Sequence, residues 1–226
     1  MNKVTAILAV LLISLCANAQ EKPIRFGVKA GMNLSSVSDI KGAGNGITVA
    51  ITQSDGMSVG FHVGGFMNYS FSQLIGIQHE FVFSMQGGKQ KLSSFLAQQL
   101  PEVPEMPAFP EVSTSYAFYY VNMPILFELK PVAGLSILAG PQFGFNVYKS
   151  VTYQDITYSG DEFNDEGFNP FDVSIAMGLQ YAFARKFHVG ARYNLGLTKT
   201  ASYNQDGISV SAWKHNVIQF SIGCAF

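Results

Sequence analysis

The sequence has little charge, few cysteines and no long hydrophobic segment in its body. Only 13% of its 226 residues are charged, about half the share found in typical soluble domains. Two cysteines are too few for a disulfide-rich scaffold. A net charge of −1 argues against a nucleic-acid partner, which would require a basic face. Because 48% of the residues are hydrophobic, disorder is excluded, and the low charge indicates that much of the surface does not face water.

The one sustained apolar run spans residues 6–15, between a basic start and the small residues Ala17-Asn18-Ala19. This order predicts a secretory signal peptide over residues 1–19, cleaved after Ala19, and a single mature domain over residues 20–226. The run is too short to cross a bilayer as a helix, which takes about 20 apolar residues. No later segment is long enough either.

The remainder of the chain alternates between apolar and polar residues in eight segments. The first has large apolar residues at every second position from Phe26 to Leu34, with Gly27, Lys29 and Asn33 among the residues between them. A period of two predicts a β-strand with two different faces. An antiparallel series of strands with long loops at one end and short turns at the other is typical of membrane barrels. The predicted long loops are 35–57, 86–116, 150–171 and 199–213, and the predicted tight turns lie near 70–74, 130–134 and 184–186.

The glycines show which face of these strands points inward. Eleven of the 22 glycines fall on the polar face, whereas Gly65 alone falls on the apolar face. Gly, Ser, Asn and Gln suit the crowded interior of a narrow barrel better than the exterior of a soluble one, which would carry Lys and Glu. We therefore predict an all-β fold, an eight-stranded antiparallel up-and-down transmembrane β-barrel. Closure is expected because an open sheet edge cannot be satisfied in hydrocarbon.

Three segments resemble a known family. Residues 26–35, residues 120–126 (Tyr-Val-Asn-Met-Pro-Ile-Leu) and residues 192–198 resemble the first, fourth and seventh strands of the small outer-membrane β-barrel family of Bacteroidota, the PorT-like group. Asn122 stands where that family often has Glu. The resemblance implies an outer-membrane location in contact with lipid, and insertion by the barrel-assembly machinery with Phe226 as the assembly signal. It implies little about activity, although one member is linked to protein secretion.

Strand parity directs six charged side chains into the barrel. Three are basic and three are acidic, and an unpaired buried charge is costly, so we expect structural ion pairs. Glu80 and Arg192 lie at similar distances from the tight turns and are predicted to meet across the lumen, which is only wide enough for side chains. The ion-pair candidates are Arg25, Lys29, Glu80, Glu128, Asp172 and Arg192.

The four histidines lack the spacing of a metal site. Parity places His62 and His188 in the lumen and His215 near the outer rim, where hydrogen-bonded structural roles are expected. His79 falls on the apolar face, so either it lies near a membrane interface or a β-bulge resets the register of its strand. Ser58 matches a nucleophile-elbow pattern, but the predicted strand around it lacks the required turn and helix. We predict no catalytic, cofactor-binding or metal-binding residues.

Two predicted loops have distinctive compositions. Residues 151–170 hold five acidic residues and no Lys or Arg, yet do not fit a calcium-loop template. Residues 101–110 carry proline at every third position, which favours a polyproline II segment or a stiff loop. We expect a non-enzymatic barrel that is structural or binds an extracellular or secretion-related partner through its loops. The alternatives are a membrane-embedded enzyme acting on lipid or peptide, with His62 or His215 as base, and an accessory to secretion or assembly.

Overall fold

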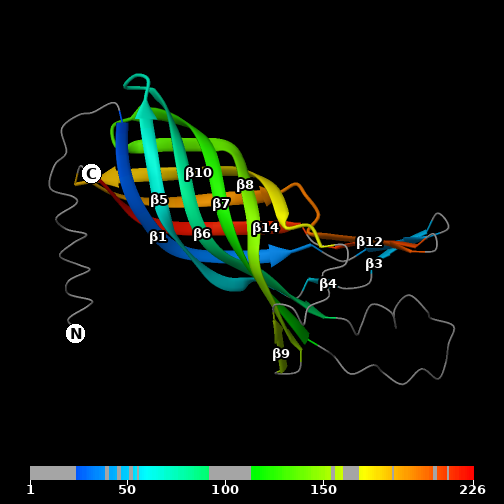
Figure 1. The fold of residues 1–226 in the computed structure, drawn as a ribbon. Coiled ribbons are helices and arrows are strands. Elements are labelled where there is room, and N and C mark those ends of the chain that lie inside the picture. Colours follow the sequence, from blue (N-terminus) through cyan, green and yellow to red (C-terminus); the bar gives the residue numbers. More distant parts are fainter. Residues whose placement is uncertain are drawn as a thin grey trace, which may run out of the picture.

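The predicted strands form a closed antiparallel β-barrel, which confirms the predicted fold class. The computed structural model describes residues 24–38, 41–44, 47–50, 53–54, 56–91, 113–153, 156–159, 168–184, 186–205, 208–212 and 214–226, so the predicted signal peptide lies outside the described residues. Neighbours in the wall are also neighbours in chain order, and the first wall strand closes the ring against the last (Figure 1). The wall strands are β1 (Ile24–Val37), β5 (Ser58–Ser70), β6 (Ile75–Lys91), β7 (Ser113–Val132), β8 (Leu135–Tyr153), β10 (Phe171–Phe183), β11 (Phe187–Gly196) and β14 (His215–Ala225).

Side chains alternate between the interior and the exterior of the barrel. On β1, Lys29 and Asn33 are buried, whereas Phe26 and Met32 on the opposite face are about half exposed. The interior is therefore largely polar and the exterior is apolar, the reverse of a water-soluble barrel and the arrangement that a bilayer requires. Exposed side chains on the outer face include Phe61, Phe81, Phe127, Leu179, Tyr181 and Ile222.

Tight turns join the strands at one end of the barrel. They connect β5 to β6 through residues 71–74, β7 to β8 through residues 133–134, and β10 to β11 just after Phe183. Gly134 adopts a φ of 83°, a left-handed conformation that glycine takes without steric cost. We call this end, which also holds the carboxyl terminus (Figure 1), the turn end, and the opposite end the loop end.

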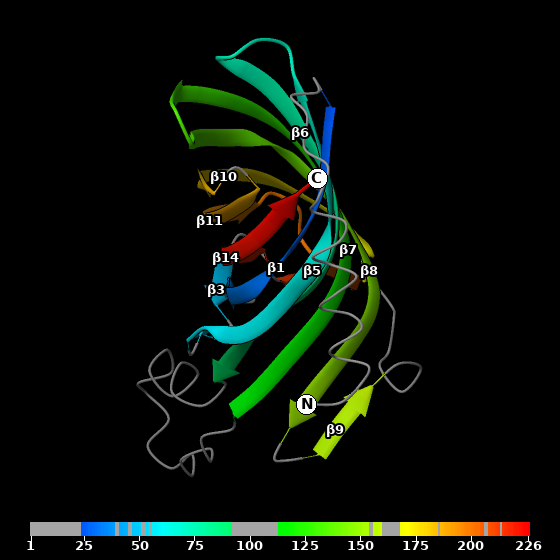
Figure 2. The same ribbon diagram turned by 90° about the vertical axis from the view of Figure 1, so that its left-hand side faces the viewer.

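Several strands reach further than the sequence predicted. β6 continues to Lys91 and β7 begins at Ser113, so the predicted loop 86–116 is partly strand, and β8 continues to Tyr153. Part of the predicted acidic loop forms β9 (Ile156–Ser159), which pairs with β8. A strand crosses a bilayer in about 9–11 residues, so β7 and β8, with 20 and 19 residues, extend beyond it toward β9 (Figure 2). The proline-rich segment 101–110 lies outside the described residues.

A second, smaller sheet projects from the loop end (Figure 1). It consists of β2 (Lys41–Gly44), β3 (Ile47–Ala50), β12 (Ala201–Gln205) and β13 (Ile208–Ala212), in the order β12-β13-β2-β3. Two regions predicted as separate loops, 35–57 and 199–213, are thus joined through the pairing of β13 with β2. The short β4 (Gln53–Ser54) pairs instead with β6.

His79 faces outward without a bulge. β6 keeps one register with β5 from His62 to Ser70, and His79 pairs with Met67 in that ladder. A bulge does occur between β7 and β8, where the register shifts at Tyr119 and Tyr120. The bulge explanation for His79 is therefore wrong. The interface explanation remains, because His79 lies two residues from Ile77, which pairs with Tyr69 near the turn end.

Aromatic side chains form belts at both ends of the apolar exterior. Such belts are characteristic of the two membrane–water interfaces of a transmembrane barrel. No helix among the described residues is long and apolar enough to span a membrane. The ring pairs are Tyr69–Phe71 and Phe183–Phe187 near the turn end, and Tyr119–Tyr148 and Phe143–Phe171 nearer the loop end.

Candidate functional site

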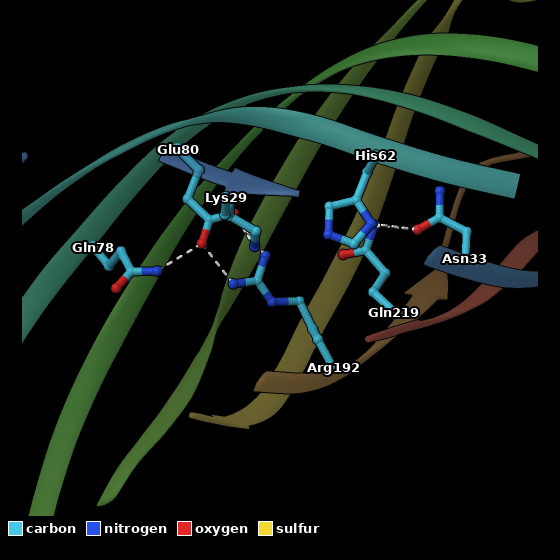
Figure 3. A network of polar contacts seen from close by, with 7 residues as sticks. All are labelled: Lys29, Asn33, His62, Gln78, Glu80, Arg192 and Gln219. Carbon is cyan, nitrogen blue, oxygen red and sulfur yellow. Dashed lines mark hydrogen bonds and ion pairs between the residues drawn. The ribbon is translucent and has the colours of Figure 1, made fainter. Parts of the chain in front are cut away.

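An ion cluster crosses the lumen and joins β1, β6 and β11 (Figure 3). The Arg192 guanidinium donates two hydrogen bonds to the Glu80 carboxylate, Nη1 to Oε2 at 2.8 Å and Nη2 to Oε1 at 2.6 Å. Lys29 Nζ donates to the same Oε2 at 3.0 Å, and Gln78 Nε2 donates to Oε1 at 2.7 Å. Glu80 is 2% exposed. A forked, charge-assisted contact of this kind is among the strongest polar interactions in proteins, so the cluster ties three strands together.

A neutral hydrogen-bond network lies next to the ion cluster (Figure 3). The His62 Nδ1 and Asn33 Oδ1 atoms lie 2.8 Å apart, and Gln219 Nε2 donates to the same Asn33 oxygen at 3.1 Å. Asn33 Nδ2 donates to Ser84 Oγ at 2.9 Å. This network links β1, β5, β6 and β14. Within this network His62 is buried. Its ring therefore does not lie at a rim where a substrate could reach it.

A second carboxylate is paired close to the turn end. Glu128 Oε1 accepts a hydrogen bond from Ser136 Oγ at 2.7 Å, and its other oxygen accepts one from Asn68 Nδ2. Lys130 Nζ lies 3.1 Å from Glu128 Oε2 and donates to Ser70 Oγ at 2.8 Å. Lys130 is absent from the predicted charge set, although it lies two residues from Glu128, and strand parity could have found it.

The two remaining candidates lie apart from these clusters. Arg25, at the start of β1, is exposed rather than enclosed in the lumen. Asp172, at the loop end of β10, is buried, and its Oδ1 accepts a hydrogen bond from Thr198 Oγ1 at 2.5 Å. Asp172 forms no ion pair with any residue that the structure describes. From the sequence, three bases were expected to pair with three acids. Instead, the Glu80 carboxylate contacts two cations, and the Asp172 carboxylate contacts none that the structure describes.

Aromatic rings fill the lumen at the loop end. Phe118 is fully buried and packs with Val37 and Tyr120. The ring of Phe118 meets that of His215 edge-on at 5.0 Å between centroids and stacks on Phe168 at 6.0 Å. His215, which was predicted near the outer rim, begins β14 at the loop end and is 2% exposed within this group. We call Val37, Tyr116, Phe118, Tyr120, Phe168 and His215 the aromatic plug.

Glycines on neighbouring strands make room for the interior rings. Gly27 pairs with Phe66 and Gly31 with His62 across β1 and β5. Gly223 of β14 likewise pairs with His188 of β11. A Cβ atom at Gly223 would overlap the His188 ring. The inward glycines of the sequence therefore offset large side chains across the strand boundary and leave room for them in a narrow lumen.

The interior can support the barrel, because its described side chains meet across the lumen at two levels. Side chains from opposite walls meet at Glu80, and the aromatic plug closes the loop end. The described residues contain no group of three or more His, Cys, Asp or Glu placed to hold a metal ion. Surfaces available to a partner are therefore those at the loop end and on the exterior.

Comparison with known proteins agrees with this architecture. Neisserial surface protein A matches over 89% of this chain and 97% of its own, with a TM-score of 0.50 and 11% identity, which shows a shared fold. OprG from Pseudomonas aeruginosa covers 89% and 95%, with a TM-score of 0.44 and 12% identity. Ail of Yersinia pestis covers 89% and 98%, with a TM-score of 0.38 and 14% identity. No curated protein matches in sequence. The family model described as outer membrane protein beta-barrel domain matches residues 18–202, and the chain belongs to that family.

Proposed function

We propose that this protein is a non-enzymatic barrel that presents a binding surface at its loop end and does not serve as a pore. The observation that carries the proposal is the filled lumen. Phe118 and Tyr120 close it at the loop end, and the contact of Arg192 with Glu80 crosses it further down. Eight strands enclose a space that side chains just fill, so the activity of the molecule belongs to what projects from the barrel.

The proposed orientation puts the loop end outside the cell. Outer-membrane barrels have short periplasmic turns and longer extracellular loops, and the eight wall strands are joined to one another by short turns at one end alone. In this arrangement residues 1–19 direct export, and both ends of the mature chain lie on the periplasmic side. The backbone N–H of Phe226 donates to the Phe26 carbonyl at 2.8 Å, so the last residue takes part in closing the ring.

The proposed partner is an extracellular or secretion-related protein that docks at the loop end. Two structured projections support this choice, the sheet of β12, β13, β2 and β3 and the extension of β7, β8 and β9 (Figures 1 and 2). Paired strands outside the membrane hold their backbone in fixed positions, and an ordered surface binds a partner at a lower entropic cost than a free loop. The burial of His62 and His215 does not favour the enzymatic alternative.

Planar-bilayer recordings of the purified barrel test the absence of a pore. We expect no stable conductance above that of a bilayer without protein, because the plug and the ion cluster interrupt the lumen. A stable unitary conductance would overturn the proposal.

Replacing residues 201–212 with a short turn then tests the surface role. Capture of a partner from native membranes should fall while the heat-modifiable mobility of the folded barrel is kept.

Surface labelling tests the orientation. A tag inserted at Gly134 should be hidden on intact cells, whereas one inserted after Pro104 should be labelled. The reverse result would contradict the proposed topology.

Deleting Phe226 tests its proposed role as a signal for the barrel-assembly machinery. We expect less heat-modifiable barrel in the outer membrane, and an unchanged amount would contradict that role.

A further inference from the structure

Asp172 differs from the other buried carboxylates that the structure describes. Glu80 contacts Lys29 and Arg192, and Glu128 contacts Lys130, all within 3.1 Å. Asp172 is 8% exposed and has the Thr198 hydroxyl as its side-chain hydrogen-bond partner. An ionised carboxylate taken out of water without a countercharge is costly. A positive charge bound here would offset that cost, and the described residues do not place one beside Asp172.

Polar groups from two strands converge beside Asp172. Gly144 of β8 pairs with Asn122 on one side and with Asp172 on the other. A Cβ atom placed on Gly144 would lie 2.7 Å from Asn122 Oδ1 and 3.6 Å from Asp172 Cβ. The Asn122 amide and the Asp172 side chain therefore lie on either side of this glycine, and the ring of Tyr120 lies against the same position.

The same wall holds buried polar atoms that lack a hydrogen-bond partner. Beside Asp172 they are Asn122 Nδ2 and Ser174 Oγ. Each of these side chains is at most 3% exposed. Ser174 lies two residues after Asp172 on the same face of β10. Buried polar groups are normally satisfied, and these two atoms beside a carboxylate without a countercharge point to a bound polar species.

We propose that Asp172 binds a small monovalent cation, of the Na⁺ or K⁺ type, inside the loop-end half of the lumen. Its carboxylate supplies the charge, and the hydroxyl of Ser174 and the amide oxygen of Asn122 complete an oxygen environment. Asparagine side chains can present oxygen by turning over their terminal amide. A single carboxylate matches one positive charge, whereas a divalent ion would leave an excess charge in a site of low dielectric constant. Water alone would satisfy the amide but not the charge.

The test is thermal unfolding of the purified barrel in uncharged detergent micelles. Melting is followed in NaCl or KCl and in choline chloride at equal ionic strength, because choline is too large to enter a lumen filled by side chains. We expect a saturable rise in Tm with Na⁺ or K⁺, as for any ligand that binds only the folded state. Asp172→Asn should abolish that rise. Glu128→Gln is the matched control and should keep it, because Glu128 has its own cation in Lys130.

Direct titration of the wild-type barrel by calorimetry keeps the proposal open to disproof should Asp172→Asn fail to fold. We expect saturable heat with NaCl or KCl that is absent with choline chloride. Equal melting in all three salts, or no saturable heat, would overturn the site. A response to Ca²⁺ alone would overturn the monovalent assignment. A cation effect of equal size in Asp172→Asn and the wild type would remove Asp172 from the site.

Discussion

At the turn end of the lumen each buried acid meets a base from the chain, whereas at the loop end a buried acid lies below aromatic rings and meets no base that the structure describes. Glu80 and Glu128 belong to the first region, and Asp172 and Phe118 to the second. The turn-end contacts join residues 51 and 112 positions apart in the chain. Charge pairing therefore holds distant strands together there, while packing closes the opposite end.

This difference assigns separate tasks to the two halves. A partnered charge network loses much when one member is removed, because the others stay buried without compensation. A packed ring loses contacts and leaves space. The turn end is consequently suited to holding the strands of the barrel together. The side chains that fill the loop end can vary more freely beside the surface proposed to bind a partner. Substitutions in each half should distinguish these roles.

The largest effect is expected for Glu80→Ala. Removing this carboxylate leaves the Lys29 and Arg192 cations facing each other in the lumen, and breaking a buried pair costs about 3–5 kcal/mol of the free energy of unfolding. Urea unfolding in micelles, followed by circular dichroism, measures it. The double variant Glu80→Gln with Arg192→Met should recover part of the loss. If the losses measured for Glu80→Gln alone and Arg192→Met alone simply add up in the double variant, the contact contributes no coupling energy.

A smaller loss, about 3 kcal/mol, is expected for Phe118→Ala, within the range for emptying a buried aromatic site. Because Phe118 closes the loop end, the variant should also let water further into the lumen, which faster hydrogen exchange of inward-facing side chains of β7 would show. Phe127→Ala on the same strand is the control, since Phe127 faces outward and is 52% exposed. Equal exchange rates in the two variants would contradict the role of Phe118 as a plug.

Gly223→Ala should cost about 1–3 kcal/mol, the usual range for overpacking. The added Cβ would overlap the ring of His188 on the neighbouring strand. Gly65→Ala offers a matched control, because a Cβ there points outward and meets nothing closer than the Gly27 carbonyl oxygen at 3.5 Å. Thermal melting compares them. Combining Gly223→Ala with His188→Ala should reduce the penalty, and an undiminished penalty would show that the ring is not its cause.

Strand parity was sufficient to place Lys29, Glu80 and Arg192 on the inner face, because side chains alternate strictly along a strand. Parity does not say which inward groups meet, since partners across a barrel depend on strand tilt and stagger. For that reason the sequence did not show that Lys29 joins Arg192 on one carboxylate, or that Asp172 meets no base in the described part of the chain. The sheet of β12, β13, β2 and β3 was missed because its short strands fall in polar regions with no sustained alternation.

The smallest effect is expected for Asp172→Asn in choline chloride, and it separates the two halves most directly. Without a cation to bind, the carboxylate of Asp172 is a buried charge with no countercharge among the described residues, so neutralising it should leave the free energy of unfolding unchanged or slightly higher. Glu128→Gln removes a charge of the same kind from the turn end but weakens contacts with Lys130, Asn68 and Ser136. That variant should lose about 1–3 kcal/mol, the range for hydrogen bonds to a charged group. Urea unfolding of both variants in the same salt gives the comparison. Equal losses would mean that the loop end holds its carboxylate as firmly as the turn end does, which would remove the distinction between the two halves.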